Sequence, residues 1–227
     1  MVATMMVHGA LAGDYEAASA AAKNGDFSRA VVLLKSLAEK GDTKAQSELG
    51  GLYLAGKGVQ ANPSEGVRWI RAAAEKGVAA AQFNLGSLYL EGHVLPVDYK
   101  AAMTWLLKAA AQNVPEAQLN IASMYFDGEG VPQDYAEAGK WLRLAAANGN
   151  ADAQVALARL YAHGQGVEKN PLRAFMWGEI AAEKSPMSES EEKTIREMAE
   201  KALTPEELQQ ARTMLKKCKD SGLKECF

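Results

Sequence analysis

The side chains of this chain that could do chemistry are three histidines, two cysteines and two serines placed three residues before a lysine. Histidine and cysteine bind metals and act as bases or nucleophiles, and a nearby lysine can activate a serine. The histidines are His8, His93 and His163. They are far apart and lack the spacing of metal ligands, so we expect no metal site and no histidine base.

The two Ser-x-x-Lys pairs are Ser190-Lys193 and Ser221-Lys224. This spacing is that of serine β-lactamases, but both pairs lie in charged terminal segments without the S-D-N and K-T-G motifs of those enzymes. G-x-S-x-G, H-E-x-x-H and phosphate-binding glycine motifs are also missing from the sequence. We therefore expect a protein that is not an enzyme and uses no cofactor.

The two cysteines, Cys218 and Cys226, both lie at the C-terminal end. One interpretation is a short disulfide loop formed in an oxidising compartment, and the other is two unrelated free thiols. A single pair favours the disulfide. Closing so short a loop would contribute about 2–3 kcal/mol, and only locally.

The charge balance and the N-terminal residues bear on partners and compartment. The net charge is −3, from 25 basic and 28 acidic residues, which is not the footprint of a nucleic-acid binder. No apolar run approaches the roughly 20 residues of a membrane span.

Ala10-Leu11-Ala12 has the form of a signal-peptidase site, although no basic residue precedes it. We expect residues 1–13 to be a leader or signal-peptide remnant of a periplasmic or secreted protein; the alternative is a chance match in a cytoplasmic one.

A repeat of 36 residues dominates the chain and must position everything else. An Ala-Gln pair, a tyrosine, a glycine and a tryptophan each recur in four copies without insertion or deletion. The glutamines are Gln46, Gln82, Gln118 and Gln154; the tyrosines Tyr53, Tyr89, Tyr125 and Tyr161; the glycines Gly56, Gly92, Gly128 and Gly164; and the tryptophans Trp69, Trp105, Trp141 and Trp177.

Each unit is predicted to form two helices. In the first copy, apolar spacing predicts a helix over residues 43–55 that ends at Gly56. After a loop, Asn62-Pro63 is an N-cap followed by a first-turn proline, and Asp134 with Glu137 predicts a capping box in the third copy. The tryptophan and an Ala-Ala pair form the buried face of the second helix, and the copies must stack because one unit cannot bury both faces.

This pattern resembles the Sel1-like repeat family, relatives of tetratricopeptide repeats with a longer loop between helices. The resemblance covers residues 43–186 as four units: 43–78, 79–114, 115–150 and 151–186. It implies an all-α, right-handed superhelical α-solenoid of helix-loop-helix repeats. Two copies depart from the pattern. Gly66 stands where the others have alanine, a change expected to alter little, and Val94 replaces a loop glycine, which predicts a different backbone path there.

The flanking segments are predicted to cap the solenoid. Residues 14–42 resemble a tetratricopeptide-like helix pair without the long loop. Residues 187–227 are expected to form C-terminal capping helices, with capping-box signatures at Ser188-Glu191 and Thr204-Glu207 and the cysteine loop at the end.

The first helix of each unit is expected to line the concave side, by analogy with the tetratricopeptide groove. Positions that face inward there differ among the four copies, whereas scaffold positions agree, so they are free for recognition. The candidate partner-binding residues are Phe83, Asn84, Ser87, Leu119, Asn120, Ser123, Phe126 and Arg159. The apolar ones would form a strip, the asparagines could bond a peptide backbone, and Arg159 could pair with a carboxylate.

Each candidate also has a structural interpretation. Phe83 and Leu119 can instead pack against the next repeat, Asn84 and Asn120 match a common consensus residue of the family, and Arg159 can be a solvated charge.

The favoured function is a scaffold or adaptor that binds a protein or peptide on its concave face, and no nucleic acid. One alternative is a secreted hydrolase of the β-lactam or peptidoglycan type, an activity for which some cysteine-rich members of the family are named. This chain lacks their regular cysteine pairs. The other alternative is a structural homo-oligomer, although we expect a monomer.

Overall fold

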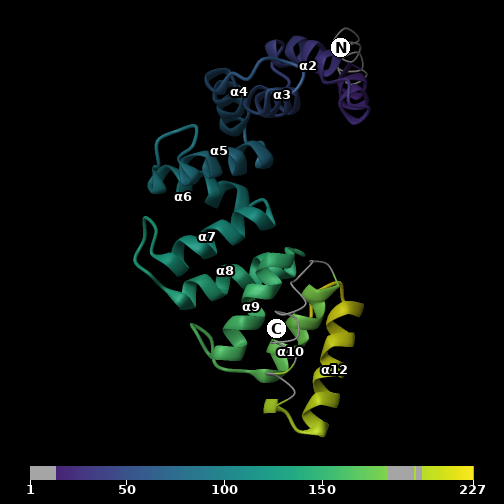
Figure 1. Cartoon of the computed structure of the whole chain (residues 1–227), viewed down its shortest axis with the longest axis vertical. Coiled ribbons are helices and arrows are strands. Elements are labelled where there is room, and N and C mark those ends of the chain that lie inside the picture. The colour runs from purple at the N-terminus through teal and green to yellow at the C-terminus, as the bar shows by residue number, and fades with distance from the viewer. Residues whose placement is uncertain (1–13, 184–196, 198–200, 227) are drawn as a thin grey trace, which may run out of the picture. The chain divides into compact units, whose positions relative to one another are not determined.

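The fold is an α-solenoid of repeated helix pairs, as the sequence predicts. The computed structural model describes residues 14–183, 197 and 201–226, and all their regular elements are helical (Figure 1). The chain divides into two compact units, residues 1–109 and 110–227, which are described separately below. Among the described residues, no helix is both long and apolar enough to cross a membrane.

The first unit holds the N-terminal helix pair and the first two repeats. A helix over residues 14–23 precedes α2 (Phe27–Glu39). The repeats follow as α3 (Thr43–Ala55), α4 (Pro63–Glu75), α5 (Ala79–Glu91) and α6 (Tyr99–Ala110). The hydroxyl of Tyr15 donates a hydrogen bond to Glu48, so the N-terminal helix is joined to the first repeat. Burial and this bond raise the pKa of Tyr15 above its ordinary value.

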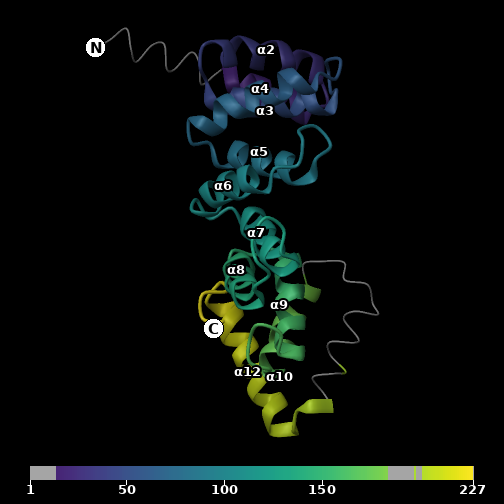
Figure 2. The ribbon, with the colours of Figure 1, turned by 90° about the vertical axis from the view of Figure 1, so that its left-hand side faces the viewer.

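The second unit holds the last two repeats and a terminal helix. Its elements are α7 (Pro115–Asp127), α8 (Tyr135–Ala147), α9 (Ala151–His163), α10 (Pro171–Ala182) and α12 (Pro205–Asp220). Helix α12 packs along α10 in both views (Figures 1 and 2), and Ala211 on α12 is buried against Phe175 on α10. Thr204 and Glu207 form the predicted capping box, whereas the Ser188-Glu191 signature lies outside the described residues.

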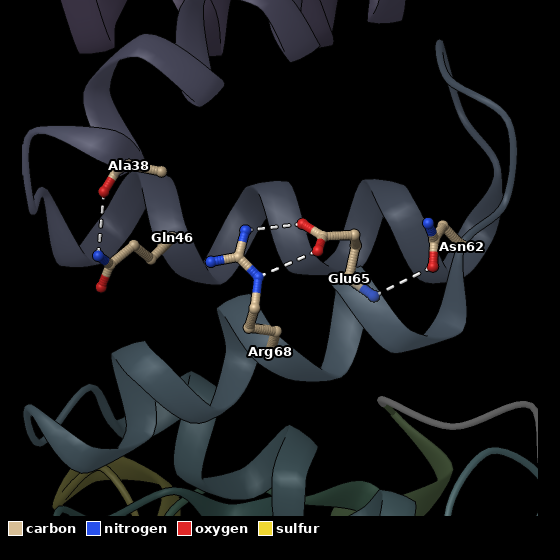
Figure 3. A network of polar contacts seen from close by, with 5 residues as sticks. All are labelled: Ala38, Gln46, Asn62, Glu65 and Arg68. Atoms are coloured by element: carbon tan, nitrogen blue, oxygen red, sulfur yellow. Dashed lines mark hydrogen bonds and ion pairs between the residues drawn. The ribbon is translucent and has the colours of Figure 1, made fainter.

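The helix ends follow the predicted signals. The first helix of every repeat stops at a left-handed glycine, with φ of 63° at Gly56, 74° at Gly92, 76° at Gly128 and 76° at Gly164. The Asn62 side chain accepts a hydrogen bond from the Glu65 N–H at 3.1 Å (Figure 3).

The predicted capping box of the third copy is only half right. The Asp134 side chain caps the Glu137 N–H, but the Glu137 carboxylate pairs with Lys140 one turn later.

A backbone hydrogen bond closes every loop between the two helices of a repeat. In each copy the N-cap residue of the second helix donates its N–H to the carbonyl of the repeated tyrosine. The pairs are Asn62–Tyr53 at 2.9 Å, Asp98–Tyr89 at 3.0 Å, Asp134–Tyr125 at 2.8 Å and Asn170–Tyr161 at 2.8 Å. The loop therefore has the same closure in all four copies despite their different sequences.

A buried glutamine ties each repeat to the helix that precedes it. The Nε2 group of the Ala-Gln glutamine donates to an alanine carbonyl at the end of that helix. These bonds are Gln46–Ala38 at 3.1 Å (Figure 3), Gln82–Ala74 at 3.1 Å, Gln118–Ala110 at 3.2 Å and Gln154–Ala146 at 3.1 Å. All four glutamines are buried, so water cannot replace the donor.

The tryptophans differ in depth although they share one repeat position. Trp69 and Trp177 are buried, as predicted, whereas Trp105 and Trp141 are only half-buried. The Lys108 ammonium lies 4.0 Å from the centre of the Trp105 ring, a cation–π contact that covers part of the exposed indole.

The second loop glycine allows the loop to approach a neighbouring backbone. At Gly166, where φ is 69°, a Cβ atom would lie 2.1 Å from the Tyr135 carbonyl oxygen at the start of α8. Val94 occupies this place in the second copy and does not adopt positive φ, so the predicted difference in that loop is confirmed.

Gly66 corrects one expectation. It was predicted to be interchangeable with alanine, but a Cβ there would lie 2.7 Å from Leu54 and 3.0 Å from the Gly50 carbonyl oxygen. Gly50 and Gly66 together let α3 and α4 pack more closely than alanine would allow.

The C-terminal cap is closed by a disulfide between Cys218 and Cys226, whose Cα atoms are 4.8 Å apart. Both residues are buried, and Cys218 belongs to the same core cluster as Trp177 and Ile180. The cysteine pair therefore ties the chain end to the last repeat.

Replacing Gln118 by alanine should lower the free energy of unfolding by about 1–3 kcal/mol, because a buried side chain and its hydrogen bond to the Ala110 carbonyl are lost. That carbonyl keeps only its bond from the Asn113 N–H. The Asn148 side chain also loses its 2.9 Å bond to Gln118. Urea unfolding monitored by circular dichroism measures the change. The exposed Gln210→Ala variant is the control and should stay within about 0.5 kcal/mol of the parent. Equal stabilities of the two variants would contradict the role given to the buried glutamine.

Gly166→Ala should destabilise the protein by about 2–4 kcal/mol, since it adds both an unfavourable φ and a backbone collision. Gly128→Ala is the matched control, because its φ is 76° but its Cβ would meet only ordinary contacts at 3.4 Å and beyond. The control should therefore lose only about 1–2 kcal/mol. Thermal and urea unfolding provide the comparison, and a control that loses as much as Gly166→Ala would rule out the close approach.

Candidate functional site

Four of the eight predicted partner-binding residues line one cavity in the second unit. Leu119, Ser123 and Phe126 lie on α7, and Arg159 lies on α9, so two successive repeats contribute. The cavity has a volume of about 320 Å³. This lies at the small end of ligand-binding pockets and leaves room for one or two apolar side chains.

The floor of this cavity is apolar and its edge is polar. Ala122, Leu142 and Leu160 are buried and complete the floor. The edge carries groups of both charges and further hydrogen-bonding groups; it consists of Ser123, Asp127, Arg159, His163 and Gln165. An apolar floor with a few polar groups at its edge is the composition of sites that bind a side chain and fix its orientation.

Neighbouring contacts hold the aromatic wall in place. The Phe126 and Tyr135 rings meet edge to face, with centroids 5.0 Å apart. The Gln133 side chain donates to the Phe126 carbonyl oxygen at 2.8 Å. Leu119 and Phe126 are half-buried and pack against the core cluster of the second unit. Leu119 therefore packs against this core and also lines the cavity.

The other predicted residues do not line this cavity. Asn120 is half-buried on α7. Phe83, Asn84 and Ser87 are half-buried on α5, in the first unit. The second repeat thus presents the same positions without forming part of the same cavity.

Several residues that line the cavity were not predicted from the sequence. Leu142 belongs to the second helix of its repeat, and Leu160 occupies a core position. Both carry the ordinary signal of a buried apolar residue, which does not distinguish a cavity wall from a filled core. Gln165 lies in the loop after α9, where helical periodicity makes no prediction.

Of the residues first considered for chemistry, Ser221 has a structural role. The Ser221 hydroxyl donates to the Cys218 carbonyl at 2.8 Å and accepts from the Glu225 N–H at 2.9 Å, so it caps the chain end. His93 and His163 are exposed in different units, while His8 and Ser190 lie outside the described residues. Within the described part of the chain, no three His, Cys, Asp or Glu side chains are placed to hold a metal ion.

Among the solved structures that are similar to this chain are two of Sel1 type. The first is a protective antigen present in uropathogenic Escherichia coli strains, described as displaying an SLR fold, with 32% sequence identity and a TM-score of 0.73. It aligns over 78% of this chain and 39% of its own. The second is a Sel1 repeat protein from Oxalobacter formigenes, with 32% identity, a TM-score of 0.69, and coverage of 76% of this chain and 49% of its own. This chain thus spans less than half the length of either.

Comparison with curated proteins found no match. The sequence pattern described as Sel1 repeat, however, matches residues 43–78, 79–114, 115–150 and 151–186. These four matches cover most of the chain, and the two similar structures are themselves Sel1-type proteins. The helix pairs, glycine stops and buried glutamines recur once in each matched stretch. The chain therefore belongs to the Sel1 repeat family.

Proposed function

We propose that this protein is a scaffold or adaptor that receives an apolar side chain of a partner polypeptide in the cavity between α7 and α9. Sel1 repeat proteins generally act in protein–protein interaction, and their fold is typically a non-enzymatic scaffold. The observation that carries the proposal is the cavity itself, to which Leu119, Phe126 and Arg159 from two repeats contribute.

The chemistry of the cavity favours a peptide whose apolar side chain is flanked by polar groups. A leucine or phenylalanine inserted against Leu119 and Phe126 would contribute about 1.5–3 kcal/mol. The guanidinium of Arg159 at the edge can bond a carboxylate or a backbone carbonyl of the same peptide. Specific recognition through a few buried contacts, surrounded by neutral ones, is typical of protein interfaces.

Ser123 offers a position from which the cavity can be blocked. Ser123 is exposed at its edge, so Ser123→Trp should fill the cavity and weaken partner binding about tenfold to a hundredfold. Affinity capture from an extract of the native organism, followed by titration of the captured partner, measures the effect. Ser36→Trp is the matched control, an exposed serine within helix α2.

A partner retained by the parent protein and the control, and lost by Ser123→Trp, supports the proposal. Equal retention by all three proteins would move the interface away from this cavity. Circular dichroism must first show that the variants keep the helical content and melting temperature of the parent.

We also propose that the protein works in an oxidising compartment, periplasmic or extracellular. The support is the disulfide between Cys218 and Cys226, since both sulfurs are buried in the C-terminal cap. Protein isolated from its native cells in the presence of a thiol-blocking reagent should carry no blocked cysteine. Labelling of both cysteines would place it in a reducing compartment.

The double variant Cys218→Ser, Cys226→Ser should have a free energy of unfolding about 2–3 kcal/mol lower than the parent, because the unfolded chain without the disulfide gains conformational entropy. Thermal unfolding measures this loss, and dithiothreitol should reproduce it in the parent protein. The same reductant should leave the double variant unchanged. A parent protein insensitive to reductant would show that the bridge adds nothing to the cap.

A further inference from the structure

A second and larger groove lies at the C-terminal end of the second unit. It has a volume of about 1150 Å³ and is bordered by the end of α8, the end of α10 and the loop that follows α12. Figure 2 shows the chain end after α12 beside α8. None of its lining residues belongs to the cavity between α7 and α9.

The floor of the groove is apolar and partly exposed. Leu144 on α8 is 49% exposed, one of few large apolar side chains in the described chain that face solvent to this extent. Ile180 and Leu223 also line the groove, and both side chains are buried in the core of the second unit. The exposed side chain of Leu144 therefore offers apolar surface that a partner could cover.

The rim of the groove is cationic on both sides. Lys140 and Arg143 line it from α8, and Lys219 and Lys224 line it from the terminal segment. Glu183 is the one acidic lining residue, and it is already paired with Lys219. The whole chain has a net charge of −3, so this concentration of positive charge does not reflect its composition.

Two of the four cations have no acidic partner among the described residues. Lys140 pairs with Glu137 on its own helix, an exposed contact of small strength. Arg143 and Lys224 form no ion pair with any described residue, and they come from opposite sides of the groove. Their charges are therefore available to carboxylates that a ligand would bring.

The terminal wall of the groove has a fixed conformation. The Leu223 N–H bonds the Cys218 carbonyl at 2.9 Å, and the Gly222 N–H bonds the Lys219 carbonyl at 3.0 Å, which is a Schellman ending of α12. Leu223 itself adopts φ of 69°, a left-handed conformation that is costly for a branched side chain. The disulfide and the burial of Leu223 hold this conformation, so a ligand meets a wall that needs no ordering.

We propose that this groove binds an acidic, extended segment of a partner protein whose apolar side chains cover Leu144. Carboxylates of the segment pair with Arg143 and Lys224. Arg143 and Lys224, which form no ion pair with a described residue, favour an acidic ligand, and the exposed side chain of Leu144 favours a polypeptide over a simple anion. This surface is separate from the cavity of the proposed function and does not depend on it.

The test uses the full chain with its disulfide intact and a fluorescein-labelled peptide in which glutamates alternate with leucines. In an extended peptide, alternate side chains point to opposite faces, so the leucines can face the floor. Fluorescence anisotropy should show saturable binding that weakens severalfold when salt rises from about 0.05 M to about 0.3 M. The same peptide with lysine in place of glutamate should not bind.

Charge reversal locates the site. Arg143→Glu with Lys224→Glu should weaken binding about tenfold or more. The matched control, Lys23→Glu with Lys100→Glu, changes two exposed lysines of the first unit and alters the net charge equally. It should keep the parent affinity within about twofold, which a nonspecific charge effect would not allow. Leu144→Ser should also weaken binding, because it removes the apolar contact.

Three outcomes would overturn the proposal: no saturable binding of the acidic peptide, equal losses in both charge-reversal variants, or equal affinity after Leu144→Ser. Stronger binding to phosphatidylglycerol vesicles than to the peptide, abolished by the Arg143 and Lys224 changes, would assign the groove to a membrane surface instead. Unfolding midpoints of all variants must match that of the parent protein, and Leu144→Ser serves if charge reversal disturbs the fold.

Discussion

A buried hydrogen bond from a glutamine side chain to a helix-end carbonyl recurs in all four repeats of this solenoid. The last carbonyls of a helix have no partner within it, and in these repeats one of them is covered by the next helix. In each copy that carbonyl accepts one backbone N–H from the turn after the helix, and the buried glutamine adds a second donor; the glutamines are Gln46, Gln82, Gln118 and Gln154. Because a buried amide donor without a partner is costly, each glutamine favours one placement of its own helix against the carbonyl it bonds. The period of 36 residues carries this constraint along the chain.

This constraint leaves one face of each first helix free to vary. The glutamine and its apolar neighbours point into the stack, while positions such as Ser123 and Arg159 point away from it. Side chains there differ among the four copies, and in the second unit they line an apolar cavity with a charged edge. The scaffold and the candidate site thus share helices but use different faces, which is how repeat proteins diversify binding on a constant core.

The two ends of the second unit are stabilised by different contacts. At its N-terminal end Gln118 bonds the Ala110 carbonyl, whereas at its C-terminal end α12 and the disulfide cover α10. Lys219, at the end of α12, lines the groove opposite Lys140 and Arg143 of α8. Lys224 joins them because the chain turns back after α12 to bring Cys226 to Cys218. The basic groove is a consequence of capping the solenoid, and no single segment carries it.

Much of this architecture follows from local rules that the sequence displays openly. Periodicity predicted the helix over residues 43–55, the glycine stops, the N-cap at Asn62 and the altered loop at Val94, since each depends on backbone preferences within a few residues. The analogy with the tetratricopeptide groove, rather than periodicity, singled out Leu119, Ser123 and Phe126 as candidates, and the structure places all three along the same cavity. Gly66 and the pairing of Glu137 were misjudged, since each depends on a close neighbour that the local pattern does not identify. The cavity between α7 and α9 and the basic groove required the folded chain, because their walls come from helices whose separation is set by packing.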